Sequence, residues 1–423
     1  MKIKEAKWDI AFLLILTVMA FITRFYHLGV PSSIVSDEHY FVDFGRHYLT
    51  HTFYHDVHPP LGKFFLALGM RIFGDTPFGW RFFTGLFGSL MIPLAYLLAK
   101  KIFKGYFIPV TFSVFILFDG LFFVQSRMAR LDVIYVFFSL LTYYLFFCYL
   151  ASGTPKKAHL FLLLSGISFG LSISTKWFAL ATIAPLFILY LSRTKWWQAC
   201  RLKKLFNFSS GFHLSRLYFF VYLIIIPFSL YFLIWQIHYG LTVTKPITWY
   251  ENYKILTYHE GITEVHTYGS SFWSWPLDIQ PFPYFSERNG DKIKVITDLG
   301  NPLIWWPGVV GALYFFRKYL FRDKKVNILL LIFLANFLPF VFIKRSLFLY
   351  HFLPAAPFLW LIFIYFLNGY WQKNNKNKII ITSYLILVAV SFIFFWPVLT
   401  GQEISQNSLN FRAWLPSWFS IIK

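Results

Sequence analysis

The chain has 423 residues, of which 57% are hydrophobic, 23% aromatic and only 13% charged. Its mean hydropathy of +0.57 excludes a water-soluble protein of this size, because soluble domains carry about 25% charged residues. The net charge of +21 could indicate nucleic acid as a partner, but the Lys and Arg residues cluster between apolar runs, as they do in cytoplasmic loops. We therefore predict a polytopic membrane protein with no nucleic-acid partner.

The first apolar run, at 10–24, follows three lysines and resembles a signal peptide. No small-residue cleavage site follows it, so we predict that it is retained as the first helix. The two cysteines, Cys148 and Cys200, are too few for a disulfide framework.

Apolar runs close to the roughly 20 residues that span a bilayer recur along the chain. Eleven of them lie at 9–28, 77–99, 105–125, 131–150, 159–175, 177–192, 217–238, 301–316, 326–343, 347–368 and 378–397. Only Lys176 separates the fifth run from the sixth, and only residues 344–346 separate the ninth from the tenth. We predict an all-α polytopic membrane protein, with one integral domain over 1–423 that forms a bundle of about eleven transmembrane helices and carries external juxtamembrane helices and loops.

The distribution of charge predicts the orientation of this bundle. With the N-terminus inside, 22 of the 39 Lys and Arg residues fall in the short connections 1–8, 100–104, 151–158, 193–216, 317–325 and 369–378, as the positive-inside rule requires. The segments 29–76, 239–300 and 398–423 then face outside. The loop 239–300 is rich in Trp, Tyr, Pro and Gly, which suits a segment that lies on the membrane surface.

The first external segment carries most of the polar chemistry. Residues 31–65 read PSSIVSDEHYFVDFGRHYLTHTFYHDVHPPLGKFF and hold four acids and five histidines. The adjacent acids Asp37 and Glu38 are either a solvated loop end or a catalytic pair, since acids at membrane boundaries are common. Two prolines follow Asp56 and His58 and restrict how the chain returns to the membrane. A restricted loop of this kind favours a site.

A second polar cluster, FDGLFFVQSRMARLD at 118–132, lies at the outer end of the third run. Arg127 and Arg130 are three residues apart and share a helix face if the helix continues through them. An arginine at the outer leaflet suits a phosphate, which it binds with two parallel hydrogen bonds. The alternative is snorkelling or pairing with Asp119 or Asp132, and spacing alone does not decide between the two.

Two further clusters are expected at the same face of the membrane. STKWFAL places Lys176 there, and IKRSLFLYHFLPAAPF places Lys344, Arg345, Tyr350 and His351 there. Several polar segments with different sequences are therefore expected to meet at the outer membrane surface.

Other chemistries find less support in the sequence. His51, His55, Asp56 and His58 offer nitrogen and oxygen ligands for a metal, but no tight ligand motif is present. A serine hydrolase also finds little support, because the G-x-S-x-G run at 166–170, GISFG, lies inside the apolar run 159–175. The absence of a Gly-rich phosphate loop argues against a soluble nucleotide donor. We therefore assign neither a metal nor a cofactor.

Seven segments, in this order, resemble the protein O-mannosyltransferases, which are membrane glycosyltransferases of the GT-C class. They are SDEHYF, HDVHPPLGKFFLALG, FDGLFFVQSRMARLD, TKW, SWPLDIQPFPYF, GNPLIWWPG and RSLFLYHFLPAAPF. The resemblance covers nearly the whole chain. The external loop of about 60 residues lacks the β-trefoil domain that eukaryotic members insert there, as in shorter bacterial members, and His39 departs from the usual spacing after the acidic pair.

The resemblance implies transfer of mannose from polyprenyl-phosphate-mannose to Ser or Thr hydroxyls of proteins, with inversion, at the outer face of a bacterial cytoplasmic membrane. It implies Asp37 as the base, with Glu38 as a neighbour that positions or shields it. Arg127 is the first candidate for the donor phosphate. The weaker phosphate candidates are Arg345 and Lys176, and the residues expected to order the loop or the acceptor are Asp56, His58 and His39. The loop 239–300 is expected to cover the donor and acceptor.

Two alternatives remain open at this point. One is a GT-C transferase with a polyprenyl-linked donor but a lipid or glycan acceptor, similar to aminoarabinose transferases. The other is a transporter, in which Arg127 and the acids line a substrate path. The charges gather in external loops and span ends, which favours the enzyme. The oligomeric state is not predicted.

Overall fold

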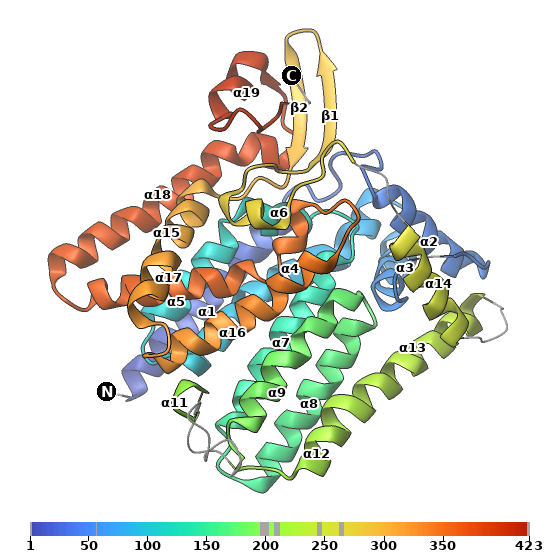
Figure 1. Ribbon diagram of the computed structural model, residues 1–423. Helices are drawn as coiled ribbons and strands as arrows, with labels where there is room; N and C mark the ends of the chain where they lie inside the picture. Colours follow the sequence, from blue (N-terminus) through green and yellow to red (C-terminus); the bar gives the residue numbers. More distant parts are fainter. Residues whose placement is uncertain are drawn as a thin grey trace.

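The computed structural model describes residues 2–55, 57–194, 203–206, 212–242, 248–261 and 266–420. Long helices cross the molecule, and shorter helices and a small sheet gather at one end of it (Figure 1). The apolar helices of the bundle, some of them short, are α1 (Lys2–Phe25), α4 (Pro77–Ile102), α5 (Phe107–Leu117), α7 (Asp132–Leu150), α8 (Pro155–Ile173), α9 (Ile183–Leu191), α13 (Ile226–Thr242), α15 (Pro302–Tyr319), α16 (Lys324–Phe337), α17 (Ala356–Trp371) and α18 (Asn375–Thr400).

The shorter elements connect or cap these helices. They are α2 (Glu38–Thr50), α3 (Leu61–Phe73), α6 (Gly120–Gln125), α11 (Lys203–Phe206), α12 (Arg216–Phe220), α14 (Thr248–Gly261) and α19 (Gln406–Arg412), the 3₁₀ helices η1 (Trp177–Thr182), η3 (Phe272–Leu277), η4 (Leu338–Phe342) and η5 (Leu349–Phe352), and the π turn η2 (Val221–Ile225).

The predicted class, an all-α polytopic membrane protein, is confirmed. Within the described residues six helices are long and apolar enough to cross a membrane: Lys7–Phe25, Pro77–Ile102, Asp132–Leu150, Arg216–Thr242, Lys324–Phe342 and Asn375–Thr400. All eleven predicted runs are helical, but some are short or interrupted. The run at 105–125 breaks between α5 and α6 at Asp119, and the run at 177–192 begins as the 3₁₀ helix η1.

The starts of several helices follow directly from the sequence. Thr76, Thr154 and Asn301 each precede a proline and each accept a hydrogen bond from a backbone N–H of the first turn. Proline is preferred at this position because its missing N–H would have no partner there. The same two-residue signal therefore begins α4, α8 and α15.

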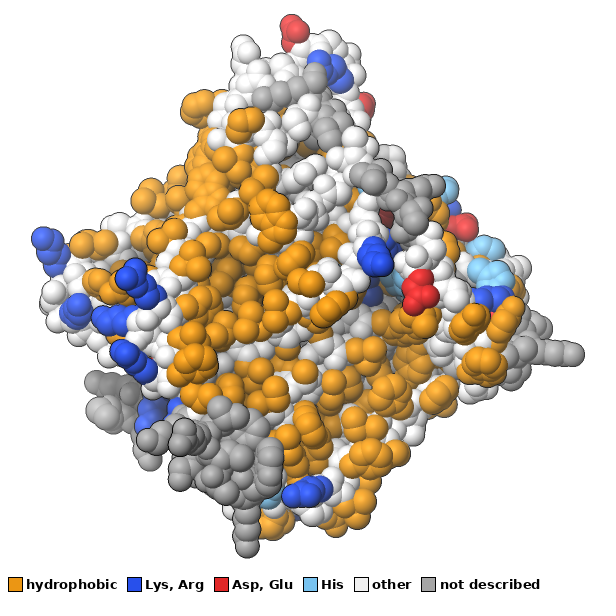
Figure 2. All heavy atoms as spheres, viewed as in Figure 1, with side chains coloured by type: hydrophobic (Ala, Val, Ile, Leu, Met, Phe, Trp, Pro, Cys, Tyr) orange, Lys and Arg blue, Asp and Glu red, His pale blue; other side chains and the backbone are white. Residues whose placement is uncertain are grey.

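The helices differ in how they are buried, and this difference shows the membrane environment. α7 lies at the centre, and 78% of its most apolar 18-residue stretch is buried. The buried share of the corresponding stretch is only 17% in α1 and 28% in α18. Ile22, Ile379 and Ile393 are each more than half exposed on those two peripheral helices. Figure 2 shows that apolar side chains cover a broad area of one face, as expected where the surroundings are lipid.

A small sheet, which the sequence analysis did not predict, lies in the external segments. Strands β1 (Pro283–Asn289) and β2 (Lys292–Thr297) form an antiparallel hairpin, and β3 (Ile404–Ser405) pairs with β2. Gly290 and Asp291 form the two-residue turn, and Gly290 has a φ of +58°. Glycine suits the first position of such a turn because it adopts positive φ without a steric cost. The loop expected over 239–300 therefore holds a helix, α14, and this hairpin.

Candidate active site

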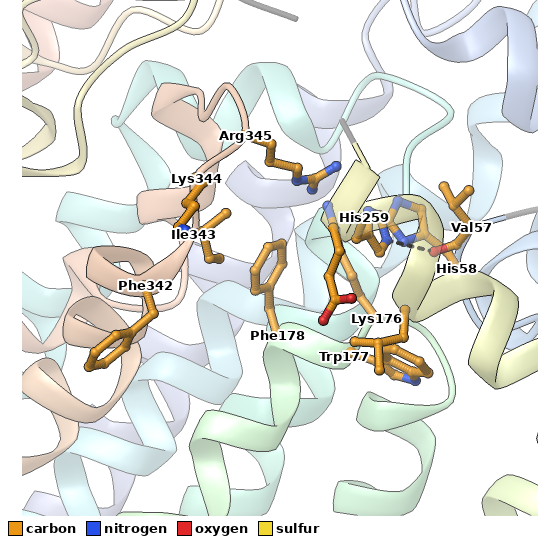
Figure 3. A pocket seen from close by; sticks show the side chains of 12 residues that line it. Val57, His58, Lys176, Trp177, Phe178, His259, Phe342, Ile343, Lys344 and Arg345 are labelled. Atoms are coloured by element: carbon orange, nitrogen blue, oxygen red, sulfur yellow. Dashed lines mark hydrogen bonds between the residues drawn. The ribbon is translucent and has the colours of Figure 1, made fainter. Parts of the chain in front are cut away.

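A cavity of about 660 Å³ lies beside the N-terminus of α2, within the ~300–1,000 Å³ typical of small-molecule sites. Its lining comes from α2, the loop before α3, the start of α7, α14 and the segment before α17: Asp37, Tyr40, Phe41, Phe44, His55, Val57, His58, Arg130, Lys176, Glu251, Lys254, Ile255, Tyr258, Arg345, Phe348, Tyr350 and His351. A neighbouring cavity of about 550 Å³ shares Val57, His58, Lys176 and Arg345 with it (Figure 3). The polar clusters at 31–65, 118–132, 174–180 and 343–358 thus meet in space, as the sequence analysis predicts.

Asp37 stands at the N-cap of α2, where the helix dipole favours a negative charge. Its side chain is 38% exposed, and Oδ2 lies 3.0 Å from Nη1 of Arg130, whose side chain is only 2% exposed. The carboxylate is therefore fixed on one side by a buried cation and open to the cavity on the other.

Glu38, the adjacent acid, points away from the cavity into the protein. Its carboxylate accepts two hydrogen bonds from Arg81, from Nε at 2.8 Å and from Nη2 at 2.7 Å. It also accepts hydrogen bonds from the backbone N–H groups of Val35 and Ala129. Both Glu38 and Arg81 have no exposed surface. Glu38 cannot touch a substrate from this position, but it ties the loop before α2 to α4 and to the segment that carries Arg130.

Arg127, the first candidate for the donor phosphate, lies away from both cavities. Its guanidinium donates hydrogen bonds to the backbone carbonyls at the C-terminal end of α1: Thr23, Arg24, Tyr26 and His27, at 2.6–3.5 Å. These carbonyls have no partner within the helix, so a buried cation is well placed there. Arg127 does not line either cavity.

Arg130, three residues further along the chain, lines the larger cavity. The two arginines do not share a helix face, because α6 ends at Gln125 and a turn separates it from α7. The guanidinium of Arg130 lies 4.2 Å from the ring centre of Tyr350 and 5.2 Å from that of Tyr284. Its buried Nε and Nη1 make no hydrogen bond of good geometry with the described residues. Nη1 and Nε instead face the carboxylates of Asp37 and Asp132, at 3.0 and 3.7 Å.

Lys176 and Arg345 both line the two cavities, as the sequence analysis expects for phosphate candidates. Nζ of Lys176 donates a hydrogen bond to Asp132 Oδ1 at 2.7 Å. Burial lowers the pKa of Lys176, an effect that Asp132 opposes and that the nearby Arg130 and Arg345 reinforce. Arg345 forms no ion pair with a carboxylate of the described residues. The cavity therefore holds more positive charge than its own acids neutralise.

The histidines of the first external segment separate in the structure. His58 lines both cavities, and its ring stacks near those of Phe41 and His259. Burial, and then the charges of Lys176 and other cations, hold the pKa of His58 well below its usual value. His39 is exposed on the outer side of α2 and lines neither cavity. Asp56 lies outside the described residues.

The sequence analysis missed the contribution of α14. Glu251, Lys254, Ile255 and Tyr258 from this helix line the larger cavity, and His259 lines the smaller one. Their spacing of three, one, three and one residues places them on one helical face, a signal that the sequence contained. Tyr284, at the start of β1, was also missed. Within the described part of the chain, no three His, Cys, Asp or Glu side chains are grouped so as to hold a metal.

Two family models match the chain. One, described as dolichyl-phosphate-mannose-protein mannosyltransferase, matches residues 14–80 and 73–242. The other, described as the C-terminal four TMM region of protein-O-mannosyltransferase, matches residues 245–418. Together the two matches span nearly the whole chain.

Curated relatives named polyprenol-phosphate-mannose–protein mannosyltransferase match over similar lengths. The protein of Mycolicibacterium smegmatis is 26% identical, with 96% of this chain and 92% of the relative covered. The protein of Mycobacterium tuberculosis strain H37Rv is also 26% identical, with 96% and 91% covered.

Solved structures share the fold. The Saccharomyces cerevisiae protein O-mannosyltransferase complex Pmt1–Pmt2 bound to the sugar donor matches with a TM-score of 0.83 at 16% identity, over 97% of this chain and 92% of that chain. ArnT from Cupriavidus metallidurans bound to undecaprenyl phosphate matches with a TM-score of 0.58 at 16% identity, over 92% and 70%.

Proposed function

The chain belongs to the dolichyl-phosphate-mannose-protein mannosyltransferase family and is an integral membrane glycosyltransferase, and from this premise we propose how and where it acts. It transfers mannose from polyprenyl-phosphate-mannose to Ser or Thr hydroxyls of proteins in a single inverting displacement. The reaction takes place at the outer face of a bacterial cytoplasmic membrane, in the cavity beside α2.

One observation carries the proposal. Asp37, an accessible carboxylate at the start of α2, shares a cavity with four cations, which are Arg130, Lys176, Lys254 and Arg345. A polyprenyl-phosphate sugar presents an anionic phosphate and an anomeric carbon to such a site. The cations suit the phosphate, and the carboxylate suits the hydroxyl that attacks the carbon.

The chemistry requires few groups. The leaving phosphate is a weak base, so it needs positive charge rather than a proton as the bond to the anomeric carbon breaks. Arg130, Lys176 and Arg345 supply that charge from a largely buried surface, where electrostatic interactions are stronger than in water. Asp37 accepts the proton of the acceptor hydroxyl as its oxygen attacks the opposite face of the sugar. One carboxylate is sufficient for this inverting reaction.

The distribution of charge supports an outward-facing cavity. Lys and Arg side chains gather near the N-terminus and the turn between α17 and α18, whereas Asp, Glu and His side chains gather near α2, α14 and the hairpin (Figure 2). The positive-inside rule assigns the first group to the cytoplasm. The cavity lies with the second group.

The test is transfer of labelled mannose from polyprenyl-phosphate-mannose to a Ser/Thr-rich peptide by the purified full-length protein in detergent. Asp37→Asn should abolish transfer. Asp43→Asn is the matched control, because Asp43 is an exposed acid on the same helix and should leave transfer unchanged. Equal transfer by Asp37→Asn and the wild type would overturn the assignment of the base. Transfer to a lipid acceptor and not to the peptide would overturn the proposed acceptor.

A further inference from the structure

We infer that Glu251 on α14 binds hydroxyl groups of the transferred sugar, an inference that rests on the proposed function and assigns the sugar's place within the same cavity. The cations and Asp37 account for the phosphate and the attacking hydroxyl. They leave the sugar's own hydroxyls without acceptors.

The position of α14 fixes where Glu251 points. The hydroxyl of Tyr231, on α13, donates a hydrogen bond of 2.5 Å to Asn252 Oδ1. Nε2 of His259 lies 3.0 Å from the backbone carbonyl of Val57, the contact drawn in Figure 3. Ile255, between them, is buried with 3% exposure. Contacts near both ends and in the middle of the helix therefore hold one face, with Glu251, toward the cavity.

The opposite face of α14 points outward and does not line the larger cavity. Trp249 and Tyr253 are 73% and 54% exposed, and their spacing of four residues places them together on the outward side. Aromatic side chains of this kind suit the membrane–water interface. Rotation of Glu251 out of the cavity would bury this surface and break the contacts of Asn252 and His259.

The carboxylate of Glu251 has unused capacity to accept hydrogen bonds. Its side chain is 17% exposed, with Oε2 3.4 Å from His55 Nδ1 and Oε1 3.6 Å from Lys254 Nζ. Both distances exceed the ~2.7–2.9 Å of a charge-assisted hydrogen bond. Glu38, by contrast, accepts four hydrogen bonds. Glu251 is thus a cavity carboxylate oriented by its neighbours but not saturated by them.

The phosphate and the sugar of the donor require different binding groups, and the cavity holds both kinds. A phosphate is repelled by a carboxylate and attracted by Arg130, Lys176 and Arg345, so we place it beside those three cations. The charge of Lys254 is offset by Glu251, 3.6 Å away. Sugar hydroxyls are hydrogen-bond donors, and a carboxylate accepts them strongly. The anionic and polyol ends of a sugar phosphate thus find complementary groups in different parts of one cavity.

The experiment compares the donor with the same lipid lacking its sugar. Full-length wild type and Glu251→Ala are reconstituted in nanodiscs, and binding of polyprenyl-phosphate-mannose and of polyprenyl phosphate is titrated without an acceptor. We expect Glu251→Ala to weaken mannosyl-donor binding about 10- to 100-fold, the loss of one charge-assisted hydrogen bond. Binding of polyprenyl phosphate should change less than about 2-fold, which also shows that the variant is folded.

Glu251→Gln keeps the shape and part of the hydrogen bonding, so it should give an intermediate loss. Glu287→Gln, an exposed acid of the hairpin, is the control and should bind both lipids as the wild type does. Equal weakening of both lipids, or no weakening of either, would overturn the inference. So would an increase in the KM for the peptide alone, which would place Glu251 at the acceptor. Because the two lipid titrations need no transfer, their result is independent of whether the wild type mannosylates the peptide.

Discussion

Nη1 of Arg130 lies 3.0 Å from Oδ2 of Asp37, and the two side chains differ sharply in exposure, 2% against 38%. A buried cation therefore holds an accessible carboxylate at the mouth of the cavity. The two residues come from segments more than 90 positions apart in the chain, so the relationship exists only in the folded protein.

Asp37→Asn should lower the kcat for mannose transfer by roughly 100- to 10,000-fold, the range for loss of a general base. The amide has nearly the same shape but cannot accept the hydroxyl proton. Donor binding should be retained. Steady-state kinetics with labelled donor, together with donor titration, measure both quantities. A large loss of donor affinity with unchanged kcat would instead make Asp37 a binding residue.

Glu38→Gln should destabilise the protein without a specific effect on donor affinity. It leaves Arg81 as a buried, uncompensated cation, and breaking such a pair costs about 3–5 kcal/mol. We expect a clearly lower midpoint of thermal unfolding in detergent, measured by the loss of helical circular dichroism. Glu287→Gln, exposed on the hairpin, should unfold as the wild type does. An unchanged midpoint for Glu38→Gln would contradict the structural role.

Arg127→Ala and Arg130→Ala should separate stability from phosphate binding. The first leaves carbonyls at the end of α1 without partners, at a cost of about 1–3 kcal/mol, and should lower the unfolding midpoint while the KM for the donor stays constant. The second should raise the KM for the donor about 10- to 100-fold, because a buried charged donor is lost. The reverse pattern would restore Arg127 as the phosphate ligand.

Lowering the pH should destabilise the fold through His259. Burial, followed by the charge of Arg345, lowers the pKa of His259 to about 4 from its ordinary 6.5. The unfolded chain therefore binds a proton between these values that the folded chain does not, so this contribution to stability is complete above about pH 6.5 and is lost as the pH falls toward 4.

We expect the difference in unfolding midpoint between pH 7 and pH 5 to shrink in His259→Gln. The exposed His39, changed to Gln, serves as the control and should leave that difference unchanged. Identical pH dependence in wild type and His259→Gln would show that His259 contributes nothing to it.

The sequence alone determined the membrane class, the helical runs and the face at which polar residues gather. These properties depend on composition and on short-range patterns: apolar runs near 20 residues, basic connections on one side, and Thr-Pro or Asn-Pro at helix starts. The resemblance to the protein O-mannosyltransferases singled out Asp37, Lys176, Arg345 and His58, and the structure places all four at the larger cavity. Their roles there stay predictions.

Only the tertiary structure decided which of two residues close together in the sequence reaches the cavity. Asp37 and Glu38 are adjacent, yet one faces the cavity and the other is buried against Arg81, because a helix start turns consecutive side chains in different directions. Arg130 lines the cavity and Arg127 does not, because the helix ends at Gln125 and the turn after it directs the two side chains to different places. Glu251 joined the site because α14 packs back on the loop that carries Val57. Which side chain faces a cavity depends on contacts between distant segments, and those contacts carry no local signal in the sequence.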